Sequence, residues 1–239
     1  MSKRTLGCLL LAVCAAAGWA APAYDDADDP VYSGGWSNGL NGGYGWQPWT
    51  NVSEGSIQPG TVLGTAWNLN NDYDYAFATA IRYLAAPMSV GETLLIDFRA
   101  LTIEFGNWGD ASWGIRLVNS SGEELLALFD YRYGSGQFWL SDNTGNHITG
   151  VPAGDVGYTL AVTLTGANTY YVDISGLYQA SGSLKTTVNG GPIAGVDVFN
   201  YNTDHDLYLN KMRVVPEPSA IALLGPVLLG MFLGRRKSR

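Results

Sequence analysis

Cysteine and histidine are scarce in this chain, with two of each among 239 residues. Cys8 and Cys14 both lie in the first 14 residues, inside a segment that has the pattern of a secretory signal peptide. A domain exported behind that leader has no thiol. This excludes a disulfide, a cysteine-ligated zinc site and a cysteine nucleophile, so the domain must be stabilised by its own core.

Basic residues are also scarce between the two ends. Six of the 13 Lys and Arg residues lie in the first four and last five positions, while 20 of the 21 acidic residues lie in residues 24–214, so that part carries a net charge near −13. Such a charge opposes binding to nucleic acid or to an anionic membrane surface. It favours solubility and contact with divalent cations.

The N-terminus predicts export through the Sec machinery. Lys3 and Arg4 precede an apolar stretch over residues 6–17, and small residues follow. The Ala21-Pro22-Ala23 triplet is the preferred cleavage site. Residues 1–23 are therefore interpreted as a signal peptide, and the mature chain is expected to begin at Tyr24.

The C-terminus combines a short motif, an apolar run and a basic end. Val215, Pro216, Glu217 and Pro218 precede residues 219–234, which contain no charge, and the chain then closes with Arg235, Arg236, Lys237 and Arg239. A membrane helix needs roughly 17–20 apolar residues, so this run spans a bilayer if the flanking basic side chains snorkel. The basic cluster predicts a cytoplasmic end, with the preceding domain outside.

The order of motif, apolar run and Arg-rich end resembles the PEP-CTERM sorting signal of Gram-negative bacteria. The resemblance implies that a membrane protease-transpeptidase, exosortase, recognises the Pro-Glu-Pro segment. It also implies delivery of the protein to the cell surface or exopolysaccharide matrix. The expected organisation is a signal peptide (1–23), an exported domain (24–214) and a sorting signal (215–239).

Residue alternation predicts an all-β domain. Leu160, Val162 and Leu164 share one face of a strand, and a Gly-Ala-Asn turn leads to a second strand with the same alternation, which indicates an antiparallel hairpin. No amphipathic helix is expected before the tail. Strands are predicted over residues 77–84, 94–99, 112–118, 125–131, 137–141, 159–164, 170–174, 196–200 and 206–214.

A second resemblance concerns the exported domain itself. Its Gly- and Trp-rich start, over residues 32–49, is similar to the start of many PEP-CTERM ectodomains. The strand order is similar to a concanavalin-like or jelly-roll antiparallel β-sandwich. This resemblance implies a fold that often binds glycans, although a fold alone does not assign a function.

Two aromatic groups are candidates for glycan stacking. The first, Trp36, Tyr44, Trp46 and Trp49, either plugs one end of the sandwich or forms a platform for sugars, and the plug is favoured because the intervening glycines let the chain cross the sandwich. In the second group some rings must be core and a minority could line a glycan face. Its candidates are Trp108, Trp113, Trp139 and Tyr131.

Alternating oxygen donors near residue 204 are the best candidates for a calcium site. Asn202, Asp204 and Asp206 provide side chains of the type that calcium prefers. The spacing does not match an EF-hand loop, and acidic surface loops are common. Apart from this calcium candidate, no cofactor is expected.

The sequence does not predict an enzyme. Neither His147 nor His205 belongs to a His-Glu-x-x-His motif. Concanavalin-like glycosidases place two carboxylates on one strand as Glu-x-Asp-x-Glu, and neither Glu104 nor Glu124 has such a partner. The sequence predicts a non-catalytic surface or matrix protein that binds exopolysaccharide. The alternative is an exported glycan-active hydrolase or lyase whose carboxylates come from different strands.

Overall fold

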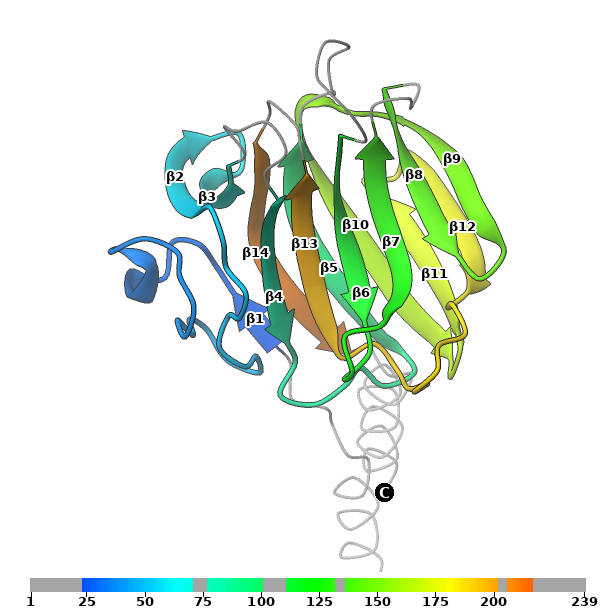
Figure 1. Ribbon diagram of the computed structural model, residues 1–239. Coiled ribbons are helices and arrows are strands. Elements are labelled where there is room, and N and C mark those ends of the chain that lie inside the picture. Colours follow the sequence, from blue (N-terminus) through cyan, green and yellow to red (C-terminus); the bar gives the residue numbers. More distant parts are fainter. Residues whose placement is uncertain (1–22, 71–76, 101–110, 132–135, 202–205, 217–239) are drawn as a thin grey trace, which may run out of the picture.

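A computed structural model describes residues 23–70, 77–100, 111–131, 136–201 and 206–216. Two antiparallel sheets stack face to face, with a smaller sheet in front and a larger sheet behind it (Figure 1). The described part of the chain is thus an all-β, jelly-roll-like sandwich. This confirms the predicted all-β antiparallel sandwich, whereas the predicted transmembrane helix lies outside the described residues.

The larger sheet has eight strands. Seven follow one another in space, and the short β1 (Ala23–Asp25) pairs with β14 beside that path. In spatial order the seven are β12 (Tyr178–Ser183), β11 (Thr169–Ile174), β10 (Gly154–Gly166), β5 (Glu92–Ala100), β14 (Leu207–Pro216), β3 (Gly64–Leu69) and β2 (Gly55–Thr61).

The smaller sheet has six strands, and it carries the candidate site. In spatial order they are β4 (Phe77–Tyr83), β13 (Gly195–Tyr201), β6 (Ser112–Val118), β7 (Glu124–Tyr131), β8 (Gln137–Asp142) and β9 (Gly145–Pro152).

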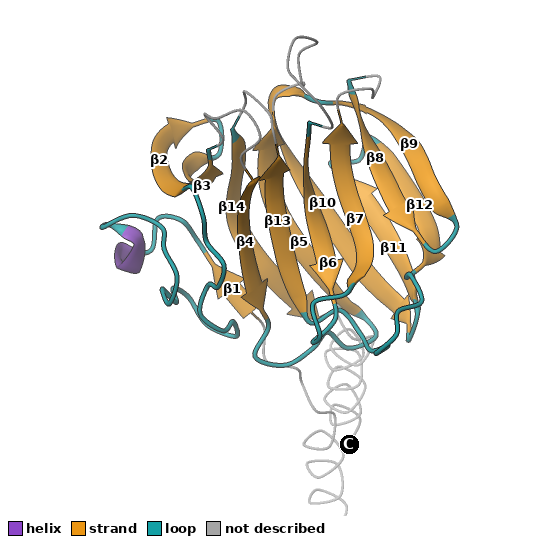
Figure 2. Ribbon diagram, viewed as in Figure 1, coloured by secondary structure: helices purple, strands orange, loops and turns teal. Residues whose placement is uncertain are grey.

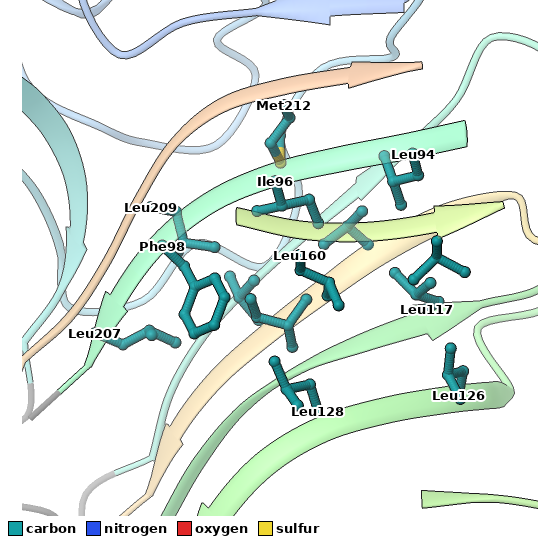
Figure 3. Packing of buried hydrophobic residues seen from close by; sticks show 14 of the residues in the cluster. Leu94, Ile96, Phe98, Leu117, Leu126, Leu128, Leu160, Leu207, Leu209 and Met212 are labelled. Atoms are coloured by element: carbon teal, nitrogen blue, oxygen red, sulfur yellow. The ribbon is translucent and has the colours of Figure 1, made fainter. Parts of the chain in front are cut away.

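The core lies between the two sheets. Strand β5 alternates buried and half-buried residues along its whole length, which directs Leu94, Ile96 and Phe98 inward. They meet Leu117 of β6 and Leu128 of β7 from the opposite sheet (Figure 3). Burial of these side chains is the main favourable term that a domain without thiols has available.

Each strand expected from alternation is present, and the predicted β10–β11 hairpin forms, with Val162 opposite Val172. The unpredicted strands are β1, β2, β3, β9 and β12. Strands β2, β9 and β12 are edge strands rich in Gly, Ser, Asn or Pro, and their pairing supplies order that their residue preferences do not.

The N-terminal segment packs against one edge of the sandwich and includes the short 3₁₀ helix η1 (Pro30–Tyr32), drawn in purple in Figure 2. Trp36, Trp46 and Trp49 are buried in it. Trp49 meets Trp36 edge to face at 4.8 Å between ring centroids and Trp67 of β3 at 5.5 Å. The rings therefore plug the sandwich, as favoured from the sequence, and only Tyr44 of this group is exposed.

A buried ion pair fastens this segment to the smaller sheet. The carboxylate of Asp25 in β1 pairs with the guanidinium of Arg82 in β4, and neither side chain is accessible to solvent. The Tyr32 hydroxyl donates to Asp25 Oδ2 at 2.6 Å and accepts from Arg82 Nη1 at 3.0 Å. Burial lowers the pKa of Arg82 to about 9, so the guanidinium remains protonated at neutral pH.

The two ends of the domain meet on one strand. Ala23 of β1 pairs with Val214, and β14 continues through Val215 and Pro216, which pair with Thr93 and Glu92 of β5. The predicted leader and tail thus join the domain at adjacent positions. Within the described residues, no helix is long and apolar enough to cross a membrane. The predicted helix at 219–234 and the basic end at 235–239 lie outside them.

Candidate functional site

The outward face of the smaller sheet gathers aromatic and charged side chains. Strand β6 shows how: Trp113, Ile115 and Leu117 belong to the core, so Gly114 and Arg116 point away from it. The residues of β13 that pair with Gly114 and Arg116, which are Phe199 and Asp197, lie on the same side but are largely buried. We call the solvent side of this sheet the outer sheet face.

An aromatic row crosses the outer sheet face at one level. Each member is the direct cross-strand partner of the next, so their Cβ positions are neighbours. The row runs from Phe199 of β13 through Gly114 of β6, Phe129 of β7 and Trp139 of β8 to Ile148 of β9. Phe129 and Trp139 are half-buried, and Ile148 is exposed.

Gly114 leaves room for this row. A Cβ at that position would lie 2.7 Å from the Phe199 ring, 2.8 Å from the Phe129 Cβ and 2.7 Å from the Leu128 carbonyl oxygen. Any larger residue would displace the rings on either side. Glycine therefore allows two aromatic side chains to lie over a central strand.

A charged row lies next to the aromatic row. Arg116 of β6 pairs with Asp197 of β13, with 3.1 Å between Nη1 and Oδ2, and with Glu124 of β7, with 3.3 Å between Nε and Oε2. Lys185, which follows β12, pairs with the other oxygen of Glu124. The Arg116 guanidinium also lies 3.9 Å from the Phe199 ring centroid. Charges of alternating sign thus adjoin flat apolar rings.

Asp197 is held in a largely desolvated position. Burial raises its pKa, and the nearby Arg116 cation opposes that effect without cancelling it. Its second oxygen accepts a hydrogen bond from the Thr79 hydroxyl at 3.1 Å. The carboxylate is therefore fixed in orientation and in its partners.

The structure describes two of the four rings predicted to stack on glycans, and it places them on opposite sides of the smaller sheet. Trp139 lies on the outer sheet face. Trp113 is 1% exposed and meets Phe138 edge to face at 5.3 Å inside the core, so it offers no ring face to a ligand there. Tyr131 ends β7, where only its backbone, paired with Ser112, is described. Trp108 lies outside the described residues.

Arg116, Asp197, Phe129 and Phe199 were not singled out from the sequence. Alternation within the predicted strands does place these four residues on the side of the sheet that faces away from the core. That alternation was the one feature of the sequence that could have indicated them. These side chains are neighbours because β13 pairs with β6 and β6 pairs with β7. Strands β13 and β6 are far apart in the sequence, and the turn between β6 and β7 does not define a register, so the sequence did not predict the contacts.

The predicted calcium ligands are only partly described. Asn202 and Asp204 lie outside the described residues. Asp206 Oδ2 accepts hydrogen bonds from the Tyr208 hydroxyl at 2.7 Å and from Asn68 Nδ2 at 3.1 Å. Across the part of the chain that the structure describes, no three His, Cys, Asp or Glu residues gather as metal ligands would.

His147 lies in a compact polar cluster at the β8–β9 turn. Its Nε2 contacts both the Thr144 hydroxyl at 2.8 Å and Asp142 Oδ1 at 3.2 Å. A hydrolytic triad needs the acid and the nucleophile on different ring nitrogens. The cluster therefore lacks triad geometry and serves to hold the turn. His205 lies outside the described residues.

Replacing Asp142 with asparagine should lower the free energy of unfolding at pH 7 by about 1–3 kcal/mol. Burial would raise the pKa of Asp142, but hydrogen bonds from Thr144, Tyr170 and His147 outweigh it and leave the pKa lowered. Ionised Asp142 therefore makes its full contribution to the free energy of unfolding above the ordinary aspartate pKa of about 3.9. That contribution is lost as the pH falls through the lower pKa that Asp142 has in the folded protein.

Urea unfolding of both proteins at pH 7 and at successively lower pH measures this difference. The gap between the original chain and Asp142→Asn should narrow as the solution becomes acidic. A gap that stays constant or widens with acid would contradict the assignment of the low pKa to this carboxylate.

Asp197 and Glu124, the two described carboxylates of the charged row, do not form a free pair. Asp197 and Glu124 come from strands on either side of β6, and both are bound to Arg116. A glycosidase needs one carboxyl free to donate a proton and another free to act as nucleophile or base. The arrangement is better suited to hydrogen-bonding a polyhydroxylated ligand, because charged donors and acceptors alternate beside the rings.

No family model matches the chain, and no curated protein matches it. Among solved structures it is similar to a sialidase, with a TM-score of 0.55 and 12% identity over 82% of this chain, although it spans only 19% of the sialidase chain. It is also similar to the carbohydrate recognition domain of Emp47p (TM-score 0.46, 14% identity, 79% and 93% of the two chains). A further match is the exoplasmic domain of VIP36 in a Ca²⁺- and mannose-bound form (0.46, 11%, 73% and 84%). At such identity the sialidase match shows a shared sandwich fold and nothing finer.

Proposed function

We propose that this chain is a non-catalytic exported protein of the cell surface or exopolysaccharide matrix, and that its outer sheet face binds glycan. The observation that carries the proposal is the aromatic row beside the charged row. Sugar rings offer apolar faces that stack on aromatic side chains, and hydroxyl groups that hydrogen-bond to charged side chains. Trp139 provides the stacking surface, while Arg116, Asp197 and Glu124 provide the polar contacts.

The overall charge favours a neutral glycan over an anionic one. The domain is strongly acidic, and the cations on the outer sheet face, Arg116 and Lys185, are already paired with carboxylates. An anionic polysaccharide would have to displace those carboxylates and approach against the net charge.

The sialidase match supports a sandwich of the kind found in a protein that acts on glycans.

Replacing Trp139 with alanine should weaken glycan binding by at least about tenfold, because the stacking surface is lost. Arg116→Ala should have a similar effect by removing the donor that orients Asp197 and Glu124. Full-length variants would be compared on an array of neutral and acidic glycans and on exopolysaccharide from the producing cells. Urea unfolding would confirm that each variant remains folded.

The larger sheet offers matched controls. Tyr171 of β11 is a half-buried aromatic residue and Arg99 of β5 is an ion-paired arginine, both in the larger sheet. Tyr171→Ala and Arg99→Ala should leave glycan binding unchanged. Equal losses from both sheets would contradict the proposed face. Glycan turnover that Asp197→Asn abolishes would instead support the hydrolase or lyase alternative.

We also propose sorting by exosortase, on the sequence of residues 215–239. The structure adds one relevant feature, which is that β14 ends at Pro216, so Glu217 and Pro218 follow directly after the last paired residue. A protease must approach the motif close to the folded domain. The leader and tail, which join the domain side by side, suit a protein that is tethered to the membrane while it folds.

Substituting Glu217 with alanine, or deleting residues 219–239, should shift the protein away from the cell surface and matrix. Fractionation of producing cells into membrane, surface and medium, followed by immunoblotting, measures the shift. Asp155→Ala, an exposed acidic residue within the domain, is the control and should distribute like the original chain. An unchanged distribution for both tail variants would rule out sorting through this signal.

A further inference from the structure

A pocket of about 240 Å³ is lined in part by residues of the β10–β11 turn and of the segment 184–191. Both segments lie at the end of the sandwich that is in the lower part of Figure 1. The walls of the pocket come from the β8–β9 turn, the β10–β11 turn and the segment 184–191, which connects β12 toward β13. Leu125 and Leu184 contribute apolar surface. Amide and hydroxyl side chains of Asn143, Asn168, Thr169, Ser183, Thr186 and Thr187 contribute the polar lining.

The walls are tied to one another by backbone hydrogen bonds. The Asn143 amide donates to the Ser183 carbonyl at 3.1 Å, the Leu184 amide donates to Asn168 at 2.9 Å, and the Lys185 amide donates to Leu125 at 2.8 Å. Each bond joins two different walls at the pocket. A ligand would therefore meet a largely preformed site and pay little ordering entropy on binding.

The outer part of the segment is also anchored. Asn119 is fully buried, and its Nδ2 donates to the Gly190 carbonyl at 2.7 Å and to the Thr187 hydroxyl at 3.2 Å. The Asn189 amide donates to Glu123 Oε2 at 3.0 Å. Because a buried side chain holds residues that line the pocket, the recess is part of the packed structure.

The lining carries no unpaired charge. Lys185 is its one charged residue, and the ammonium group pairs with Glu124. The lining combines uncharged amides and hydroxyls with the apolar surface of two leucines. It therefore suits a ligand whose hydroxyl groups can hydrogen-bond to the polar lining and whose apolar face can contact the leucines. The volume lies below the roughly 300–1,000 Å³ of typical small-molecule sites, which suits one sugar ring better than a longer chain.

We infer that this pocket binds a single neutral sugar unit, such as the end or a side branch of a polysaccharide. None of the aromatic row lines the pocket, although Lys185 belongs both to the pocket lining and to the charged row of the outer sheet face. Two separate sites on one domain allow a single copy to hold two glycan chains, or to hold one chain more tightly by engaging it twice. The inference therefore stands or falls separately from the proposed function.

Nuclear magnetic resonance of the ¹⁵N-labelled full chain tests whether a neutral sugar binds in this pocket. The probes are the methyl glycosides of glucose, galactose, mannose and N-acetylglucosamine, with sodium glucuronate for comparison, each added up to about 50 mM because single sugars bind weakly. At least one neutral glycoside should shift the side-chain amide signals of Asn143 and Asn168. Absence of any shift there, or a larger shift with glucuronate, would overturn the inference.

Variants locate the site. Thr186→Tyr should fill the pocket and abolish the shifts, and Asn168→Ala, which adds no bulk, should weaken binding about tenfold by removing one hydrogen-bonding group. Val188→Ala alters a residue of the same segment that is 95% exposed and does not line the pocket, so it should bind normally. Trp139→Ala should also leave pocket binding intact. Unchanged affinity in both pocket variants would place the sugar elsewhere.

Discussion

Replacing Arg82 with methionine should lower the free energy of unfolding by about 3–5 kcal/mol, because it leaves the Asp25 carboxylate buried without its counter-charge. Both side chains are inaccessible to solvent. Methionine fills most of the space of the arginine stem, so the loss arises chiefly from charge and hydrogen bonds. Urea unfolding followed by tryptophan fluorescence measures it.

The expected loss of stability is large because the Arg82 guanidinium donates hydrogen bonds to many acceptors. Beyond Asp25 and Tyr32, its guanidinium donates to Asn41 Oδ1 at 2.7 Å and to the Gly42 and Gln47 carbonyls at 2.9 and 3.0 Å. It also lies 5.2 Å from the Trp49 ring centroid. These contacts link β4 to the N-terminal segment, which has little regular structure of its own.

Two comparisons test the cause. Asp155→Ala breaks the surface pair with Arg99 and should cost less than about 1 kcal/mol, since Asp155 is largely exposed. The double variant Asp25→Leu with Arg82→Met removes both buried charges and should be clearly less destabilised than the sum of the single variants. Additive losses would show that the charges do not depend on one another.

Replacing Trp49 with alanine should also destabilise the protein, by about 3–5 kcal/mol. The ring is completely buried between Trp36 and Trp67, and its Nε1 donates to the Tyr32 hydroxyl at 3.1 Å. Its removal would leave a large cavity and an unfilled hydrogen-bonding position beside the buried ion pair. Denaturant unfolding and loss of near-ultraviolet circular dichroism report the change.

Tyr44 provides the control from the same Gly-rich segment. It is 56% exposed, so Tyr44→Ala should change the free energy of unfolding by no more than about 0.5 kcal/mol. Neither Trp49→Ala at low temperature, where it remains folded, nor Tyr44→Ala should alter glycan binding. A loss of affinity in Tyr44→Ala would show that this segment carries a sugar platform in addition to its role as a plug.

Much of the fold follows from local residue patterns. Alternation placed the central strands correctly, because their buried and outward positions differ sharply in polarity, as in β5 and β10. It missed strands such as β2 and β12, which have few β-branched or aromatic residues and form because a neighbouring strand supplies hydrogen-bond partners. The favoured role of the N-terminal tryptophans was correct as well, since glycines let the chain fold back over them.

The sequence by itself determined the all-β class, the β10–β11 hairpin and the absence of cysteine from residues 24–214, all of which depend on composition or on neighbours within a few positions. Only the tertiary structure decided which aromatic rings face solvent. Trp113 and Trp139 occupy similar strands, yet one is in the core and the other on the outer sheet face. It also joined Arg116 to Asp197 and Asp25 to Arg82, residues separated by 81 and 57 positions. Such pairs form through strand order and register across a sandwich, and these are set by the packing of the whole domain rather than by any local pattern.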